Sequence, residues 1–239
     1  MQKAALRGEP SYVWRAGQQR RFEMILAAAG SRVKGMILED GCGVGMYMAR
    51  FQGHSPRVFG LEYDFERAVD AAKVSPLVIN GAGEFLPYPA NSFDLVLSHE
   101  VLEHVQDDRK SAAEMVRVLK PGGRAVVFVP NIGYPFETHG VYWGGKYYFG
   151  NKLFVNYLPR GLRDRLAPHV NVYSAKQAKA LFSGLPCEIV EHRVIFGAYD
   201  NLIARFGAAG KLLRAAMQAL ETSPLSGLGL SHFLVVQKN

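Results

Sequence analysis

Residues 37–45 read "ILEDGCGVG", a short apolar run followed by two carboxylates and three glycines within five positions. Glycine costs backbone entropy on folding, so this density indicates a turn that larger side chains would obstruct. A helix that begins directly after such a turn presents unpaired backbone N–H groups, and the glycines allow a ligand to lie against them. Many turns without any function also contain Gly-x-Gly. The neighbouring segments are therefore needed to tell a ligand-binding turn from one that only connects a strand to a helix.

Short apolar segments alternate with helical patterns through the first 150 residues, which predicts βαβ units and a parallel sheet. Strands are expected at 35–40, 57–64, 76–81, 92–100 and 124–131. Helices are expected at 20–30, 45–53, 65–73 and 107–123. The last of these has Asp107 or Asp108 as its N-cap, and the Pro-Gly-Gly at 121–123 is its stop signal.

The alternation of short apolar segments with helical patterns ends after Asn131. Residues 132–173 are rich in Gly, Tyr, Phe, Trp and Pro and have no clear period, which is typical of a lid or binding loop with small elements of its own. A helix with a Ser174–Gln177 capping box is expected over 174–184, and strands over 187–196 and 231–238. We therefore expect a single domain over 1–239 with core motifs at 36–131, a substrate-covering insertion at 132–173 and a helical insertion at 198–226.

Composition limits the classes of protein that the chain can belong to. Its 239 residues suit one domain with a full core, and its 2 cysteines are too few for a disulfide framework. The start, "MQKAALRGEPSYVWR", has no continuous apolar core, and no stretch reaches the ~18 apolar residues of a membrane span. These features predict a cytoplasmic protein. The net charge of +7 fits an anionic partner or simple solubility, but no Lys/Arg block reaches the ~5–8 residues of a nucleic-acid tract.

A second feature supports a ligand at the glycine turn. Glu62 ends the strand expected at 57–64 and follows Gly41 by 21 positions, where a carboxylate can accept hydrogen bonds from a ribose diol. The ligand is therefore expected to contain a nucleoside. Met46 stands where the NAD fingerprint has its third glycine, which disfavours a nicotinamide-dependent oxidoreductase.

Four segments occur in order over residues 36–131: "ILEDGCGVG", "VFGLEYD", "GEFLPYPANSFDLVLSHEVLEHV" and "RVLKPGGRAVVFVPN". Together they resemble the class I S-adenosylmethionine-dependent methyltransferases, in the branch whose core is called the methyltransferase type 11 domain. The resemblance implies an α/β fold with a Rossmann-like, seven-stranded, mostly parallel sheet in the order 3-2-1-4-5-7-6 and helices on both faces. It also implies S-adenosyl-L-methionine as cofactor and S-adenosyl-L-homocysteine as product.

The resemblance also implies roles for individual residues. The methionine part of the cofactor would be held by Glu39 and the backbone of 41–45, and Ser98 and His99 would lie beside the reacting methyl. Family members commonly carry an Asp that reads the adenine amino group; this chain has Ala82 there, which leaves that contact to Gly83 or Glu84. The implied cofactor set is Glu39, Gly41, Cys42, Gly43, Gly45, Glu62 (ribose), Tyr63 (adenine), Gly83, Glu84, Ser98 and His99.

Methyl transfer is an in-line displacement in which positioning supplies much of the acceleration, and a base is needed only if the acceptor must lose a proton. His139 follows the strand at 124–131, where open α/β sheets place ligands, and Glu137 could orient it. His104 in "LEHV" is the other candidate, although both histidines also suit a packing role. A metal held by Glu137, His139 and His169 lacks any short His-x-x-His or Cys-x-x-Cys spacing, so no metal site is predicted.

The favoured function is methyl transfer to a small-molecule, sugar or lipid-like acceptor, with a hydroxyl oxygen as the expected target. The aromatic residues within 132–173 indicate an apolar acceptor pocket. An RNA methyltransferase and a non-catalytic S-adenosylmethionine-binding protein are the alternatives, and "SHEV" in place of Asn/Asp-Pro-Pro-Tyr argues against methylation of base amino groups. The cationic amphipathic stretch 201–221 suits a peripheral membrane contact, a homodimer contact or a cover for the core.

Overall fold

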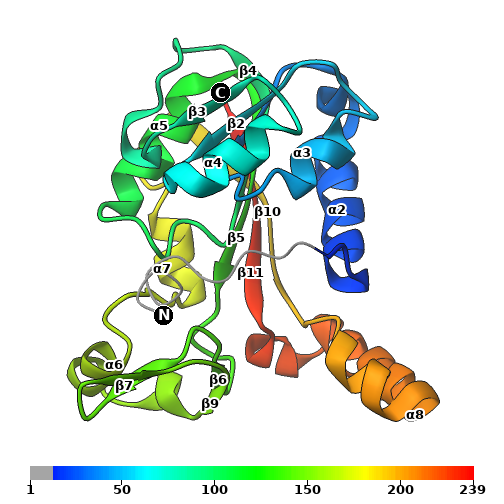
Figure 1. The fold of residues 1–239 in the computed structure, drawn as a ribbon, viewed down its shortest axis with the longest axis vertical. Helices are drawn as coiled ribbons and strands as arrows, with labels where there is room; N and C mark the ends of the chain where they lie inside the picture. Colours follow the sequence, from blue (N-terminus) through cyan, green and yellow to red (C-terminus); the bar gives the residue numbers. More distant parts are fainter. Residues whose placement is uncertain (1–12) are drawn as a thin grey trace.

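The computed structural model describes residues 13–239 and contains a seven-stranded sheet in the order β10-β11-β5-β4-β1-β2-β3 (Figure 1). Strands β1 to β5 run parallel, and β11 lies antiparallel between β5 and β10. This is the predicted order 3-2-1-4-5-7-6, which is confirmed. The strands are β1 (Ile37–Asp40), β2 (Val58–Glu62), β3 (Val78–Asn80), β4 (Phe93–His99), β5 (Leu119–Pro130), β10 (Cys187–Ile195) and β11 (Ser231–Lys238). The expected absence of a signal peptide falls mostly on residues 1–12, outside the described residues.

Helices cover both faces of the sheet because successive strand residues point to opposite sides. Leu95 and Leu97 join one buried apolar cluster with residues of α2 and α3, whereas Val96 joins a second cluster with residues of α5 and α7. Both faces are thus closed by apolar packing, as a central parallel sheet requires. The helices are α2 (Ala16–Ala29), α3 (Met46–Phe51), α4 (Phe65–Ala72), α5 (Asp108–Val118) and α7 (Ala175–Ala180), with the 3-10 turns η1 (Gly30–Lys34) and η2 (Gly83–Phe85).

Two of the predicted helix starts are confirmed at the level of single hydrogen bonds. Asp107 caps α5 by accepting a bond of 2.9 Å from the backbone N–H of Lys110. Ser174 and Gln177 form the expected capping box of α7. The predicted end of α5 is wrong, because the helix stops at Val118 and β5 already begins at Leu119. The Pro-Gly-Gly segment therefore lies inside a strand, where pairing with β4 shifts register between Phe93 and Leu95.

Residues 132–173 form a small separate layer at the lower end of the sheet in Figure 1. It contains the strand pairs β6 (Phe136–Glu137) with β9 (Lys152–Leu153) and β7 (Val141–Trp143) with β8 (Lys146–Tyr148), then η3 (Val155–Tyr157) and α6 (Arg160–Leu166). Its two ends meet where Tyr173 donates its backbone N–H to Pro130 (3.0 Å) and accepts from Ile132 (2.9 Å). This layer lies at the carboxyl ends of β4 and β5, where the site is expected.

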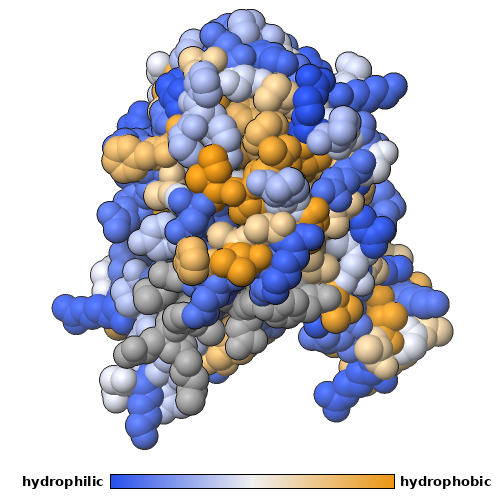
Figure 2. All heavy atoms as spheres, turned by 45° about the horizontal axis from the view of Figure 1, so that its top comes forward, coloured by the Kyte–Doolittle hydropathy of each residue, from blue (hydrophilic) through white to orange (hydrophobic). Residues whose placement is uncertain are grey.

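Helix α8 (Asp200–Ala219) projects from the lower right of the molecule in Figure 1 and is followed by η4 (Leu220–Thr222) and η5 (Pro224–Leu228). Gly207 has non-helical backbone angles (φ 51°, ψ −119°), so α8 is two helical segments joined at a kink. Figure 2 shows apolar side chains on this arm, in agreement with the exposure of Phe206, Leu212 and Leu213. Within residues 13–239 no helix is long and apolar enough to cross a membrane.

Candidate active site

The glycine turn between β1 and α3 is a cradle of left-handed backbone. Gly41, Gly43 and Gly45 have φ angles of 78°, 56° and 83°, which side chains with a Cβ rarely adopt. The backbone N–H groups of Gly41 and Cys42 bond to the carbonyl of Leu61 at 2.8 and 2.9 Å, so the turn is tied to β2. Nothing lies within 4 Å of where a Cβ on Gly43 would point. The middle of the turn therefore faces open space, as a ligand cradle must.

Glu62 closes this cradle from the side of β2. Its carboxylate accepts hydrogen bonds of 2.8 Å from the backbone N–H of Gly43 and 2.8 Å from that of Asp64. Each carboxylate oxygen has a further acceptor position, so Glu62 can still receive the hydroxyls of a ribose. Tyr63, the next residue, is 61% exposed at the rim, which suits a ring that covers a flat ligand.

Two buried carboxyl groups lie at the end of β1. Glu39 and Asp40 are 3% and 1% exposed, and one oxygen of each has no hydrogen-bond partner in the part of the chain that the structure describes. Burial raises the pKa of Glu39 well above its ordinary value. Burial and the nearby charges of Glu84 and Glu62 raise the pKa of Asp40 to about 7. A cation bound beside these carboxyl groups would favour their ionised forms and be held by them.

Asp40 is the one member of this group that the sequence analysis did not assign. A Cβ on Gly83 would lie 3.1 Å from both carboxylate oxygens of Asp40, so glycine permits the close approach. Glu84 is held by bonds from the backbone N–H groups of Gln106 (2.8 Å) and Asp107 (3.4 Å). In the sequence, the only sign of this role is that Asp40 follows Glu39 in "LED". The fold is needed to show that Asp40 faces the region of Gly83.

Ser98 and His99 end β4 beside this region. Ser98 is fully buried, and its hydroxyl has no hydrogen-bond partner among the described residues. His99 lies 2.6 Å from a guanidinium nitrogen of Arg21, and its ring packs against Tyr47 and Phe128. Burial, aided by Arg21, lowers the pKa of His99 to about 3, so the neutral ring accepts a hydrogen bond from Arg21. His99 thus positions Arg21 within the protein.

A cavity of about 240 Å3 lies where β5 and β11 meet the small layer. Glu100, which has a left-handed φ of 57°, turns into its wall and bonds to Arg21 (3.1 Å) and Ser231 (2.7 Å). Although burial opposes ionisation, Arg21 and His99 lower the pKa of Glu100 below its ordinary value. The cavity therefore combines charged and aromatic walls, among them Arg21, Glu100, Asn131, Tyr134, Phe136 and His139.

The predicted partnership of His139 and Glu137 is present. Nδ1 of His139 lies 3.0 Å from one oxygen of Glu137, and Arg163 lies 3.0 Å from the other. The side chains of Glu137 and Arg163 are 1% and 6% exposed, so this ion pair is buried under the cavity. Burial alone would raise the pKa of Glu137, but the contacts with His139 and Arg163 outweigh it and lower this pKa. An ionised Glu137 fixes Nδ1 of His139 as the protonated nitrogen.

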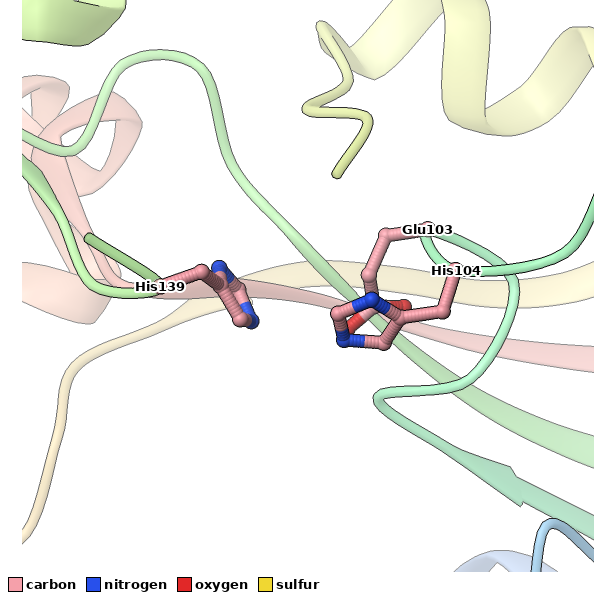
Figure 3. Close-up of side chains that lie close together, drawn as sticks. All are labelled: Glu103, His104 and His139. Atoms are coloured by element: carbon pink, nitrogen blue, oxygen red, sulfur yellow. The ribbon is translucent and has the colours of Figure 1, made fainter. Parts of the chain in front are cut away.

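His104 and Glu103 face His139 from the turn after β4 (Figure 3). The rings of His104 and His139 lie 5.1 Å apart at an interplanar angle of 81°. Burial and the neighbouring His139 lower the pKa of His104 to about 4, and burial raises that of Glu103 well above its ordinary value. His169 packs instead against Tyr142 and Tyr147. The structure therefore groups His104 with His139 and adds Glu103, which the sequence analysis missed.

Comparisons with known proteins find methyltransferases. Residues 38–127 match the family model described as a methyltransferase domain. A probable S-adenosylmethionine-dependent methyltransferase of Mycolicibacterium smegmatis is 35% identical over 115 residues, which are 47% of this chain and 45% of that relative. A demethylmenaquinone methyltransferase of Renibacterium salmoninarum is 29% identical over 175 residues, 69% of this chain and 68% of that one. The first of these matches therefore spans less than half of the relative's length.

Solved structures show the same fold. An S-adenosylmethionine-dependent methyltransferase from Mesorhizobium loti aligns with a TM-score of 0.65 at 18% identity, covering 93% of this chain and 98% of that one. Residues 38–127 thus resemble a methyltransferase domain, and the chain has the fold of S-adenosylmethionine-dependent methyltransferases. The residues present fit this cofactor. The open cradle at Gly43 admits it, and the unpartnered carboxyl oxygens of Glu39 and Asp40 suit its cationic sulfonium and ammonium groups.

Proposed function

We propose that the protein transfers a methyl group from S-adenosylmethionine to an oxygen of a small-molecule, sugar or lipid-like acceptor bound in the cavity beside His139. The observation that carries the proposal is that this cavity and the glycine turn both lie at the carboxyl end of the parallel sheet. Its volume of about 240 Å3 suits a small ring or the end of a longer molecule. The relative named for demethylmenaquinone supports an aromatic, lipid-like acceptor.

The bound cofactor supplies an electrophilic methyl group. Glu39 and Asp40 supply the negative charge that holds its cationic end, and Glu62 fixes the ribose through the same carboxylate that shapes the turn. The small layer covers the cavity and limits access of water. His139, oriented by Glu137, is the proposed proton acceptor for the hydroxyl, with its Nε2 as the atom that receives the proton.

Helix α8 is a proposed contact surface for the membrane or carrier in which a lipid-like acceptor resides. Phe206, Leu212 and Leu213 are 54%, 74% and 44% exposed, and Arg205 and Lys211 lie in the same helix. Flotation with anionic vesicles tests this contact. Binding that is lost in Leu212→Glu supports it, whereas a concentration-dependent dimer without vesicle binding assigns α8 to a homodimer.

The test of the function uses S-adenosylmethionine with a radiolabelled methyl group, the purified protein and cell extract separated into lipid, glycan, nucleic-acid and small-molecule fractions. Label in a lipid, glycan or small-molecule fraction is the expected result. Label in RNA would overturn the proposed acceptor class. Cofactor binding without label in any fraction would favour a non-catalytic S-adenosylmethionine-binding protein.

A further inference from the structure

Three metal-ligating side chains meet at the wall of the acceptor cavity. Glu103 and His104 come from the turn after β4, and His139 comes from the small layer, so segments far apart in the sequence converge here (Figure 3). One potential ligand atom of each residue lies within 4.8 Å of the other two. His139 also lines the cavity of about 240 Å3, which places the cluster beside the proposed acceptor.

Polar atoms of two members of this cluster, Glu103 and His104, lack hydrogen-bond partners among the described residues. Glu103 is 2% exposed, and both of its carboxylate oxygens are without a hydrogen bond within residues 13–239. Nδ1 of His104 is also buried without a hydrogen bond in that range. Buried polar groups are normally paired, because leaving one unpaired costs about 1–3 kcal/mol. A cation between Glu103 and His104 would give such unpaired atoms a partner.

The orientation of His139 also fits a bound cation. Glu137 accepts the proton on Nδ1 at 3.0 Å and is itself held by Arg163 at 3.0 Å. With Nδ1 protonated, Nε2 carries a lone pair, and Figure 3 shows the ring of His139 directed toward His104 and Glu103. A carboxylate that bonds to the far nitrogen of a metal-ligating histidine is a recurrent support for metal ligands.

We propose that Glu103, His104 and His139 bind a divalent transition-metal ion, for which we take zinc as the type, with an open coordination position toward the acceptor cavity. Two imidazoles and one carboxylate favour zinc, iron or manganese over magnesium or calcium, which prefer oxygen ligands. Zinc–ligand distances of about 2.0–2.2 Å bring ligand atoms to roughly 3.5 Å from one another. Binding therefore requires the three ligand atoms, which lie within 4.8 Å of one another, to move closer together.

The role of this ion rests on the proposed function, although its binding does not. An acceptor hydroxyl at the open position becomes more acidic because the cation stabilises its oxygen anion. His139 then serves as a ligand, and the hydroxyl proton passes instead to the carboxylate of Glu100 in the cavity wall. This inference departs from the sequence analysis, which predicted no metal site because no short His-x-x-His or Cys-x-x-Cys spacing is present. Glu103 and His104 are adjacent in the sequence, and His139 lies 35 positions after His104.

The experiment titrates Zn2+ into tag-free protein that a chelator has stripped of metal, with calorimetry as the readout and Mg2+ in a parallel titration. One zinc ion per chain is expected, and Co2+ at the same site should give visible d–d absorption. Glu103→Gln and His104→Ala should each lower zinc affinity by more than about 100-fold, and Glu137→Gln by about 10–100-fold as a positioning residue. His54→Ala removes an exposed histidine outside the cluster and should leave affinity unchanged.

Zinc binding that is absent in the parent protein, or equally tight in Glu103→Gln and His104→Ala, overturns the proposal. Far-ultraviolet circular dichroism of each variant identifies any that fails to fold, and Glu103→Gln keeps the side-chain volume for this reason. A separate titration with S-adenosylmethionine tests the proposed function in the same protein. A protein that binds the cofactor without zinc, or zinc without the cofactor, therefore shows which of the two proposals has failed.

Discussion

The carboxylate of Glu62 accepts a hydrogen bond of 2.8 Å from the backbone N–H of Gly43, so the end of β2 holds the middle of the glycine turn. The same carboxylate bonds to the N–H of Asp64, which caps α4. One side chain thus fixes the shape of the cradle and presents acceptor positions to a ribose. Loss of Glu62 should therefore affect cofactor binding through both effects.

Glu62→Ala should weaken S-adenosylmethionine binding by about 1.5–3 kcal/mol, which is the scale of a lost hydrogen bond to a charged group. Isothermal titration calorimetry measures this change. Glu66→Ala in α4 is the matched control, because Glu66 is an exposed glutamate of the same segment. Equal affinities of the parent protein and Glu62→Ala would remove Glu62 from the cofactor site.

Asp40→Asn should stabilise the cofactor-free protein at pH 8 and change it little near pH 4. The folded-state pKa of Asp40 is about 7, above the ordinary 3.8, so ionisation costs stability as the pH rises through this interval. Removing the buried charge should recover about 1–3 kcal/mol at pH 8. This corresponds to about 2–4 °C in Tm per kcal/mol. Thermal melts at the two pH values check it, and a Tm difference that is independent of pH would contradict the buried, titrating carboxyl.

His139→Ala should lower turnover by about 10²–10⁴-fold without a change in S-adenosylmethionine affinity. The reason is that His139 lines the proposed acceptor cavity, and no residue of the glycine turn is part of that lining. Methyl transfer to the labelled acceptor fraction measures turnover, and calorimetry measures cofactor affinity. Loss of cofactor binding in this variant would instead assign His139 a structural role.

Arg163→Met should loosen the small layer and leave the sheet intact. In this variant Glu137 would lose its buried ion pair with Arg163. Removing one partner of a buried ion pair typically costs about 3–5 kcal/mol of folding stability. Hydrogen exchange should therefore accelerate within 132–173, turnover should fall, and S-adenosylmethionine affinity should persist.

Arg160→Met is the control for this prediction, because Arg160 is 84% exposed and its pair with Asp164 spans 3.6 Å. Exposed pairs of this kind contribute about 0–1 kcal/mol. A uniform rise of exchange over the whole sheet in Arg163→Met would show that the ion pair supports the entire domain.

The core sheet could be predicted because each strand carries its own signal. Strand β4 alternates residues between two apolar clusters, and Asp107 marks the start of α5 with a cap that is visible in the sequence. The start of β5 could not be predicted, because Pro121 and the two glycines after it are typical of turns. Only pairing with β4, with its shift of register, makes that segment a strand.

The glycine turn and Glu62 were accessible to sequence reasoning because they have a fixed spacing, whereas the other cofactor residues were assigned only through the family resemblance. Their assigned roles remain predictions until binding is measured. The cluster around His139 was not accessible. The strands of the small layer are two or three residues long, so they leave no period, and side-chain contacts such as those of Asn156 with the carbonyls of Tyr134 and Phe136 hold their loops. In the sequence alone, nothing distinguishes Glu103 from other charged residues, because its burial is visible only in the structure.

The two ends of the small layer meet at Tyr173, whose backbone bonds to Pro130 and Ile132 on the other side of the excursion. A segment that leaves and re-enters a domain at adjacent points can be exchanged without redirecting the chain around it. Replacing 132–173 as a unit should therefore change the proposed acceptor cavity while the sheet and the glycine turn stay intact. Chimaeras joined at Asn131 and Ser174 are the natural place to begin such a transplant.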